Sequence, residues 1–333
     1  MRLSVPEGNI ELTPVGGGRT RIDLKPFDPK LYIPVFSCET SHESEVEFFV
    51  HSGVSFAWLC DAISRFEDPE GVRRILERQL FAYLEPESLR GMRVLDLGCG
   101  RGASSFAIAE LLPSATVVGL ELDAELVRFA RQLVACRGVS NLTFFVSPAG
   151  DHLPPDLGKF DVIMLSAVYE HLLPEERRRL MPRIWAALRP GGTLFVNQTP
   201  HRWVPFEHHS TGLWGINYLP DRIAHQYARR FARISPAINR SPDWQTHLRG
   251  GLRGGTERTI VSDLTLGSDT RGVILQPNRA RYRDRADYWL GGTSQRLRPV
   301  KRCIAFVFRI SDRLFDSIPA LNVDVAIRKE LLT

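Results

Sequence analysis

The residues best suited to chemistry lie in a glycine-rich stretch that follows an acid, Asp96. The loop Gly98-Cys99-Gly100-Arg101-Gly102 carries few side chains, so its backbone N–H groups can approach a ligand closely. A second acid, Glu121, follows Gly102 by 19 residues. A carboxylate at that place can accept hydrogen bonds from both hydroxyls of a ribose. These residues therefore predict a site for a ligand that contains a nucleoside.

The spacing of the glycines helps to choose the ligand class, because both a dinucleotide and S-adenosylmethionine fit such a loop. A dinucleotide site expects G-x-G-x-x-G, whereas this loop is G-x-G-x-G. A buried acid before the loop, Asp96, suits a cationic amino-acid group better than a pyrophosphate. The spacing favours S-adenosylmethionine. Cys99 is predicted to be a small filler behind the loop, since the sequence places no base beside it.

Strands and helices alternate around these residues, and this alternation must position them. Apolar strands are predicted at residues 93–97, 116–122, 142–146, 160–167 and 193–199, with helices at 69–84, 103–112, 124–135 and 174–188. Strands that are apolar on both faces, with helices between them, indicate a parallel sheet covered on two sides. Ligands of such sheets bind beyond the carboxyl ends of the strands, which is where Asp96 and Glu121 lie.

Four motifs in order carry a family resemblance. VLDLGCGRG (94–102) resembles the first motif of the class I S-adenosylmethionine-dependent methyltransferases, and VVGLELD (117–123) resembles their second. FDVIMLSAVYEHL (160–172) and LRPGGTLFVNQTP (188–200) are similar to their fourth motif and fifth-strand motif. The resemblance covers roughly residues 70–200. It implies an α/β, Rossmann-like fold with a seven-stranded, mostly parallel sheet, and methyl transfer from S-adenosylmethionine.

The resemblance also implies which residues hold the donor. The family often has an acid after the third strand that bonds the adenine, and here Ala149 stands in that place. Gly150 or Asp151 is expected to take the contact instead, although Asp151 can equally be a turn residue. The predicted donor-binding set is Asp96, Leu97, Gly98, Gly100, Gly102, Glu121, Leu122, Gly150, Asp151 and Ser166.

An acid–histidine pair, Glu170-His171, follows the fourth strand and is a candidate for the acceptor side of the site. His171 can act as a general base, or it can cap the next helix and pack. Some quinone O-methyltransferases of this fold carry an additional acid three residues before the glutamate of this motif. Here that position is Ala167, so no metal is predicted.

A second candidate for the acceptor side is the polar and aromatic loop over residues 199–220. It resembles the T-P-N-R…P-x-E-x-H segment of bacterial methyltransferases that are encoded with glycan or secondary-metabolite genes. Glu207 and His209 match the E-x-H pair. The alternative is a structural loop whose histidines cap turns. The predicted catalytic residues are His171, His209 and Glu207.

Three regions are expected along the chain. Residues 1–68 form an amino-terminal cap, of which 1–60 are predicted to be irregular; residues 69–200 form the donor-binding core; residues 201–333 supply the acceptor lid, a helical insertion and the last two strands. Those last elements are a helix at 257–266, a strand at 272–277 and a strand at 321–329 that returns antiparallel beside it. The basic segment 296–318 has apolar residues at helical spacing. It is either a helix packed on the core or an interfacial helix that contacts a membrane.

Composition sets the broad class of the protein. With 43% hydrophobic and 24% charged residues, the 333-residue chain is an ordinary globular protein rather than a disordered or fibrous one. No run of 18 apolar residues and no signal peptide is found, and five scattered cysteines indicate reduced thiols in the cytoplasm. The net charge of +5 is concentrated in residues 271–333, which hold 13 Lys and Arg but only 6 Asp and Glu. No motif that reads nucleic acid is present.

The sequence thus predicts a cytoplasmic enzyme that O-methylates a sugar, a glycan intermediate or a small metabolite, with peripheral contact at the inner membrane face left open. Three alternatives remain at this point: an N- or C-methyltransferase, a nucleic-acid methyltransferase, and a donor-binding module without catalysis. The oligomeric state and the acceptor are not predicted.

Overall fold

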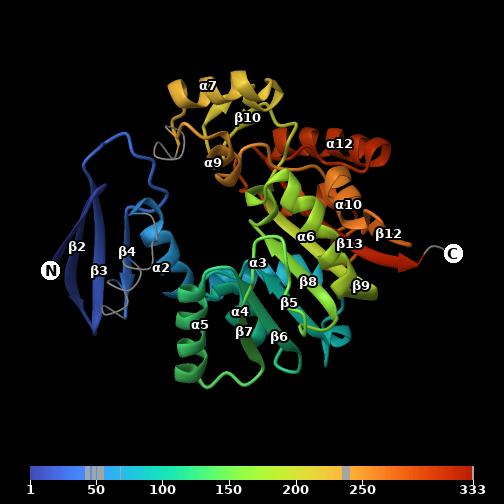
Figure 1. Cartoon of the computed structure of the whole chain (residues 1–333), viewed down its shortest axis with the longest axis horizontal. Coiled ribbons are helices and arrows are strands. Elements are labelled where there is room, and N and C mark those ends of the chain that lie inside the picture. The colour runs from blue at the N-terminus through green and yellow to red at the C-terminus, as the bar shows by residue number, and fades with distance from the viewer. Residues whose placement is uncertain (42–45, 47–49, 51–55, 68, 235–240, 332–333) are drawn as a thin grey trace.

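A computed structural model describes the chain except for residues 42–45, 47–49, 51–55, 68, 235–240 and 332–333 (Figure 1). Its centre is a seven-stranded sheet in the order β12-β13-β9-β8-β5-β6-β7. The strands are β5 (Arg93–Leu97), β6 (Thr116–Glu121), β7 (Leu142–Val146), β8 (Phe160–Ser166), β9 (Leu188–Pro200), β12 (Thr270–Ile274) and β13 (Asn322–Leu331). All neighbours are parallel except β13, which runs antiparallel to both β9 and β12. The predicted fold class is confirmed, including the antiparallel last strand.

Helices cover both faces of this sheet, as strands that are apolar on both sides require. One face packs against α3 (Pro69–Phe81), α4 (Ala103–Leu111) and α5 (Ala124–Arg137). The other face packs against α6 (Pro174–Ala187) and α10 (Glu257–Thr265). The chain order reverses between β5 and β8, because β6 and β7 lie to one side of β5 and β8 to the other. This switch point is where open α/β sheets bind their ligands.

The amino-terminal region differs from the irregular structure that we predicted for residues 1–60. It forms an antiparallel sheet of β1 (Arg2–Val5), β2 (Gly8–Gly16), β3 (Arg19–Pro26) and β4 (Ser37–Thr40), followed by η1 (Phe56–Trp58) and α2 (Leu59–Glu67). In β3 buried side chains alternate with exposed ones, and a glycine turn with positive φ joins it to β2. This is a hairpin pattern. The prediction missed it because the alternating runs are short and interrupted by prolines.

The carboxyl-terminal additions lie on the α6 side and above the sheet edge (Figure 1). The lid loop contains β10 (Phe206–Glu207), β11 (Leu213–Trp214) and η4 (Ile216–Tyr218), and it leads to α7 (Asp221–Phe231) and α9 (Trp244–Arg249). Between β12 and β13 lie α11 (Arg285–Gly291) and α12 (Arg298–Phe315), the predicted helical insertion. Among the described helices, none combines the length and the apolar character needed to cross a membrane.

Candidate functional site

The glycine loop follows β5 at the switch point, and packing explains two of its glycines. Gly98, Gly100 and Gly102 all have positive φ, at 72°, 56° and 93°. A Cβ added at Gly98 would lie 2.4 Å from a methyl group of Val168, and one at Gly102 would lie 2.6 Å from the Phe144 ring. At Gly100 a Cβ would meet nothing within 4 Å. The open space beside Gly100 is therefore available to a ligand rather than to the protein.

The two predicted acids lie at the ends of neighbouring strands but have different surroundings. Asp96 is buried and accepts hydrogen bonds from the hydroxyls of Ser104 (2.7 Å) and Ser105 (2.6 Å), which begin α4. Burial raises the pKa of its carboxyl. Glu121 accepts hydrogen bonds from the N–H groups of Gly100 (2.9 Å) and Leu122 (2.6 Å). Its carboxylate thus ties the loop to the end of β6.

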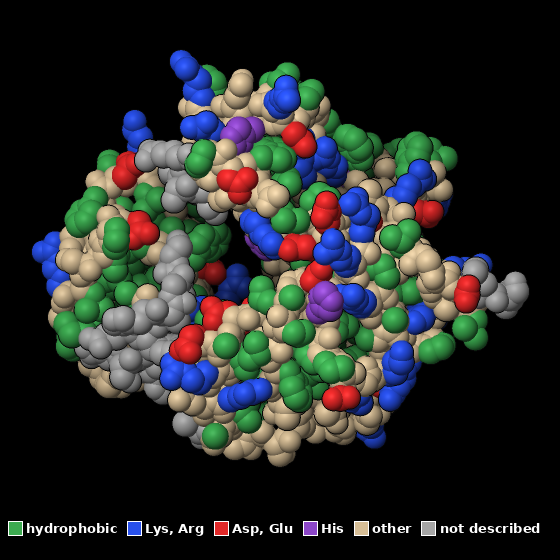
Figure 2. Space-filling view, viewed as in Figure 1, with side chains coloured by type: hydrophobic (Ala, Val, Ile, Leu, Met, Phe, Trp, Pro, Cys, Tyr) green, Lys and Arg blue, Asp and Glu red, His purple; other side chains and the backbone are tan. Residues whose placement is uncertain are grey.

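Two cavities meet at the loop. The first, of about 260 Å³, is lined by Leu97, Gly98, Glu121, Leu122, Gly150 and His171, among others. The second, of about 680 Å³, lies toward the amino-terminal unit, which is the sheet β1–β4 with η1 and α2. It is lined by Trp58, Asp61, Gly98, Gly100, Ser166 and Gln198, among others. Gly98 and Ala167 line both cavities. Figure 2 shows a hollow in this face of the molecule, between the amino-terminal unit and the carboxyl-terminal additions.

The structure separates the predicted donor residues into three groups. Most lie on a cavity wall, including Leu97, Leu122, Gly150 and Ser166. Asp96 and Gly102 lie behind the loop and shape it. Asp151 is occupied elsewhere: it forms ion pairs with Arg179 (3.1 Å) and His152 (2.6 Å), and these hydrogen bonds lower its pKa. Sequence reasoning did not name Trp58 or Gln198, because their sequence distance from the loop gives no local signal.

Comparison with known proteins identifies one domain in this chain. A family model described as a methyltransferase domain matches residues 94–192, from the start of β5 into β9. Residues 94–192 form a class I methyltransferase domain. The donor of this domain class is S-adenosylmethionine.

Curated relatives share only part of this chain. It is 36% identical over 139 residues to trans-aconitate 2-methyltransferase of Deinococcus radiodurans, covering 42% of this chain and 48% of that one. It is 34% identical over 116 residues to a ubiquinone biosynthesis O-methyltransferase of Xanthomonas campestris, covering 34% and 46%. It is 34% identical over 110 residues to the carboxy-S-adenosyl-L-methionine synthase of Chromohalobacter salexigens, covering 32% and 40%. The chain spans less than half the length of each of these relatives.

One solved structure aligns along most of this chain. The YcgJ protein of Bacillus subtilis covers 79% of this chain and all of its own, with 16% identity and a TM-score of 0.40.

Near the smaller cavity, the segments that follow β8 and β10 bring three polar side chains together. Glu170 and His171 belong to η3 (Tyr169–His171), and the ring of His209, from the loop after β10, lies 5.5 Å from that of His171 between centroids. Burial raises the pKa of Glu170, which is fully buried. Burial and the nearby His171 lower the pKa of His209 to about 4. The structure thus brings together His171 and His209, which the sequence only named separately.

The third predicted catalytic residue, Glu207, has a different environment. It is buried, and its two oxygens accept hydrogen bonds from the backbone N–H groups of residues 209, 210 and 211 and from the hydroxyls of Ser210 and Thr211. Such a carboxylate organises the loop and has no lone pair left to serve as a base. Its effect on the site is to fix the backbone of His209. Cys99 is also buried, and burial raises the pKa of its thiol, which agrees with the predicted role as filler.

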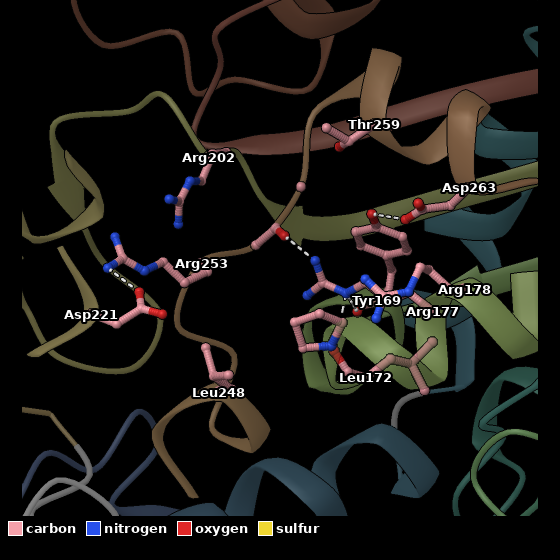
Figure 3. Close-up of a pocket in the computed structure, with 13 residues that line it drawn as sticks. Tyr169, Leu172, Arg177, Arg178, Arg202, Asp221, Leu248, Arg253, Thr259 and Asp263 are labelled. Carbon is pink, nitrogen blue, oxygen red and sulfur yellow. Dashed lines mark hydrogen bonds and ion pairs between the residues drawn. The ribbon is translucent and has the colours of Figure 1, made fainter. Parts of the chain in front are cut away.

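An arginine-lined cavity of about 400 Å³ borders Tyr169 of η3 (Figure 3). Arg177 packs over the Tyr169 ring and donates to the Gly254 carbonyl, while Arg253 pairs with Asp221. Burial and the nearby Arg253 lower the pKa of Arg202 to about 10. Sequence reasoning missed this cluster, since its arginines come from three distant segments.

Proposed function

We propose that this chain is an S-adenosylmethionine-dependent methyltransferase that transfers a methyl group to an oxygen of a small molecule or a glycan intermediate. The observation that carries the proposal is the position of Glu121 and the bare glycine loop on the walls of two cavities that share lining residues at the switch point. Two of the curated relatives above are named as methyltransferases of different molecules and the third as a synthase, so the acceptor class belongs to the proposal. The division into cap (1–68), core (69–200) and lid with insertion (201–333) is proposed with it.

The residues present fit the donor. Glu121 offers a carboxylate to the ribose, and Leu122 and Gly150 lie on the same cavity wall for the adenine. Gly100 leaves room for the amino-acid end, and Ser166 and Gln198 line the same cavity. When bound, S-adenosylmethionine supplies the electrophilic methyl group.

The chain's own contribution is orientation and exclusion of water. Methyl transfer is an in-line displacement, so holding the two reactants in alignment supplies much of the rate enhancement. We infer that the acceptor enters through the larger cavity, between the loop and Trp58 of the amino-terminal unit. We infer that Glu170, His171 and His209 form a polar wall on the acceptor side of the donor. His171 lines the smaller cavity, and the ligand atoms of the three side chains lie within 4.8 Å of one another. The histidines favour an oxygen acceptor, which needs a polar group beside its proton.

Replacing Glu121 with glutamine is expected to weaken the binding of S-adenosylmethionine and S-adenosylhomocysteine about 30-fold, or about 2 kcal/mol, because a charged acceptor of ribose hydroxyls is lost. The measurement is calorimetric titration. Glu125→Gln is the matched control and should bind as the wild type does, because Glu125 is an exposed glutamate in the first turn of α5. Absence of binding by the wild type, or equal binding by Glu121→Gln, would overturn the donor assignment.

The acceptor class is tested with donor that carries a labelled methyl group. Hydroxylated metabolites and glycans, RNA and protein are supplied separately. Labelling of RNA or protein alone would overturn the small-molecule proposal.

We also propose that α12 rests on an anionic membrane surface. Its exposed apolar residues, Val300, Ile304, Val307, Ile310 and Leu314, recur at helical spacing, with exposed fractions of 38–67%. Arg302 and Arg313 are exposed along one edge of this face, and the one acid between 296 and 315, Asp312, is buried. Hydrophobic side chains gather on this part of the surface in Figure 2. An apolar face edged by arginines complements anionic lipid.

The double variant Val307→Asp/Leu314→Asp is expected to bind vesicles of phosphatidylglycerol and phosphatidylcholine at least about tenfold more weakly than the wild type, because charge is placed on the inserted face. Co-sedimentation measures the effect. Ile223→Asp, an exposed apolar position on α7, is the control. The alternative is that this face of α12 binds a second copy of the chain, and light scattering without vesicles tests it. If the wild type binds no vesicles and forms a dimer that the double variant does not form, the face belongs to a dimer interface.

A further inference from the structure

Glu170, His171 and His209 bring one potential ligand atom each close together, and His171 also lines the smaller cavity. These three atoms lie within 4.8 Å of one another, although the residues come from η3 and from the lid loop. The cluster has one fully buried acid and two half-buried histidines. The mechanism above uses it only as a polar wall.

The carboxylate of Glu170 is incompletely satisfied. Its Oε2 accepts a hydrogen bond from the hydroxyl of Thr199 (3.0 Å), which fixes its orientation. Its Oε1 is buried and has no hydrogen-bond partner. Arg177, the nearby guanidinium, donates to the backbone carbonyl of Glu170 rather than to its side chain. A buried carboxylate oxygen without a partner costs folding free energy, so we expect this atom to contact a cation or a hydrogen-bond donor.

The ring of His171 is oriented as a ligand would be. Its Nδ1 lies 2.7 Å from the carbonyl oxygen of Arg249, which can only accept, so Nδ1 carries the proton. Nε2 then has a free lone pair, and it lies 3.9 Å from Glu170 Oε1. A backbone carbonyl that holds the other ring nitrogen is typical of metal-binding histidines.

The ring of His209 reaches the cluster because two features of the fold allow it. Its backbone N–H donates to Glu207 Oε1 (2.8 Å), which fixes the loop. Gly251, with φ of 93°, faces the ring: a Cβ there would lie 2.4 Å from His209 Cδ2 and 3.4 Å from Glu170 Cγ. Only glycine leaves His209 this close to Glu170.

We propose that Glu170, His171 and His209 bind a divalent transition-metal cation. Two imidazoles and one carboxylate suit Zn²⁺, Mn²⁺ or Co²⁺, and three protein ligands leave a position open for water or an acceptor oxygen. Ligand bonds of about 2.0–2.2 Å place donor atoms roughly 3–4 Å apart, so the three side chains must draw together by about 1 Å. The sequence expectation of no metal rested on Ala167, whereas the structure brings the third ligand from the lid.

This proposal deepens the proposed function, in which the same wall faces the acceptor, but it can be tested without donor or acceptor. The protein is stripped with a chelator and titrated with Co²⁺, whose visible absorption reports its ligands, and with Zn²⁺ by calorimetry. We expect one cation per chain. His209→Ala and Glu170→Gln should each weaken binding at least about tenfold and remove the absorption bands. Gly251→Ala should weaken it too, because the added methyl group displaces the His209 ring.

His208→Ala is the matched control, since His208 neighbours the cluster without joining it. Urea unfolding shows that each variant is folded. The proposal is overturned if the wild type binds no cation, or if His209→Ala binds as tightly as wild type. If the wild type binds no metal and Glu170→Gln is more stable than the wild type, the Glu170 side chain is a protonated carboxylic acid rather than a metal ligand. If the wild type binds S-adenosylhomocysteine but no metal, the metal site is wrong and the proposed function is unaffected. If it binds the metal but not S-adenosylhomocysteine, the proposed function is wrong and the metal site is unaffected.

Discussion

Arg285→Leu is expected to lower the free energy of unfolding by about 3–5 kcal/mol. Arg285 of α11 is 2% exposed and donates to Glu257 of α10 (2.5 Å) and to Asp312 of α12 (2.7 Å). The Arg285 guanidinium therefore joins the three helices α10, α11 and α12. Its loss leaves two buried carboxylates without their main counter-charge, which costs far more than the pair itself contributes.

Urea unfolding followed by tryptophan fluorescence measures this effect. Arg283→Leu is the matched control, because its guanidinium is 80% exposed in its pair with Asp287, and such pairs contribute about 1 kcal/mol or less. A second change, Glu257→Gln, should recover part of the loss in the Arg285→Leu background, since it removes one unpaired charge. Equal losses in the two arginine variants would contradict the assigned role.

Glu257 makes the same cluster a source of acid sensitivity. Burial alone would raise the pKa of Glu257, but the hydrogen bond with His201 and the charge of Arg285 outweigh it and lower the pKa to about 2. Because the folded pKa lies below the ordinary value of 4.5, the carboxylate stabilises the fold fully above about pH 4.5. That stabilisation is lost as the pH falls toward 2 and amounts to about 3 kcal/mol.

The test compares wild type with Glu257→Gln, since glutamine does not titrate. Unfolding free energies are measured from pH 7 down to pH 3. The wild-type advantage should be constant from pH 7 to about 5 and shrink below that, and a difference independent of pH would show that Glu257 has an ordinary pKa.

Local patterns account for what could be predicted. Both β5, at Arg93–Leu97, and the glycine loop after it were predicted to the residue, because buried parallel strands are short apolar runs and tight loops need glycine. The amino-terminal sheet was missed because strands such as β3 alternate over only a few residues. The meeting of His209 with Glu170 depends on Gly251, in a third segment. No local signal could reveal such a contact between distant parts of the chain.

The role of Glu207 shows a different limit. The E-x-H spacing marked Glu207 and His209 as a pair, but the same pattern fits a base and a carboxylate that accepts backbone N–H groups. Only the five hydrogen bonds from residues 209–211 distinguish the two.

The antiparallel strand β13 has a consequence for how the chain is made. It fills the place between β9, which ends at residue 200, and β12, yet it begins only at residue 322. At a synthesis rate of about 5–20 residues per second, the β9 edge stays open for roughly 6–24 s while the residues between them emerge. An unpaired strand edge in a half-made sheet is a template for association with other chains. The nascent chain is therefore most exposed to such association in the interval before β13 arrives.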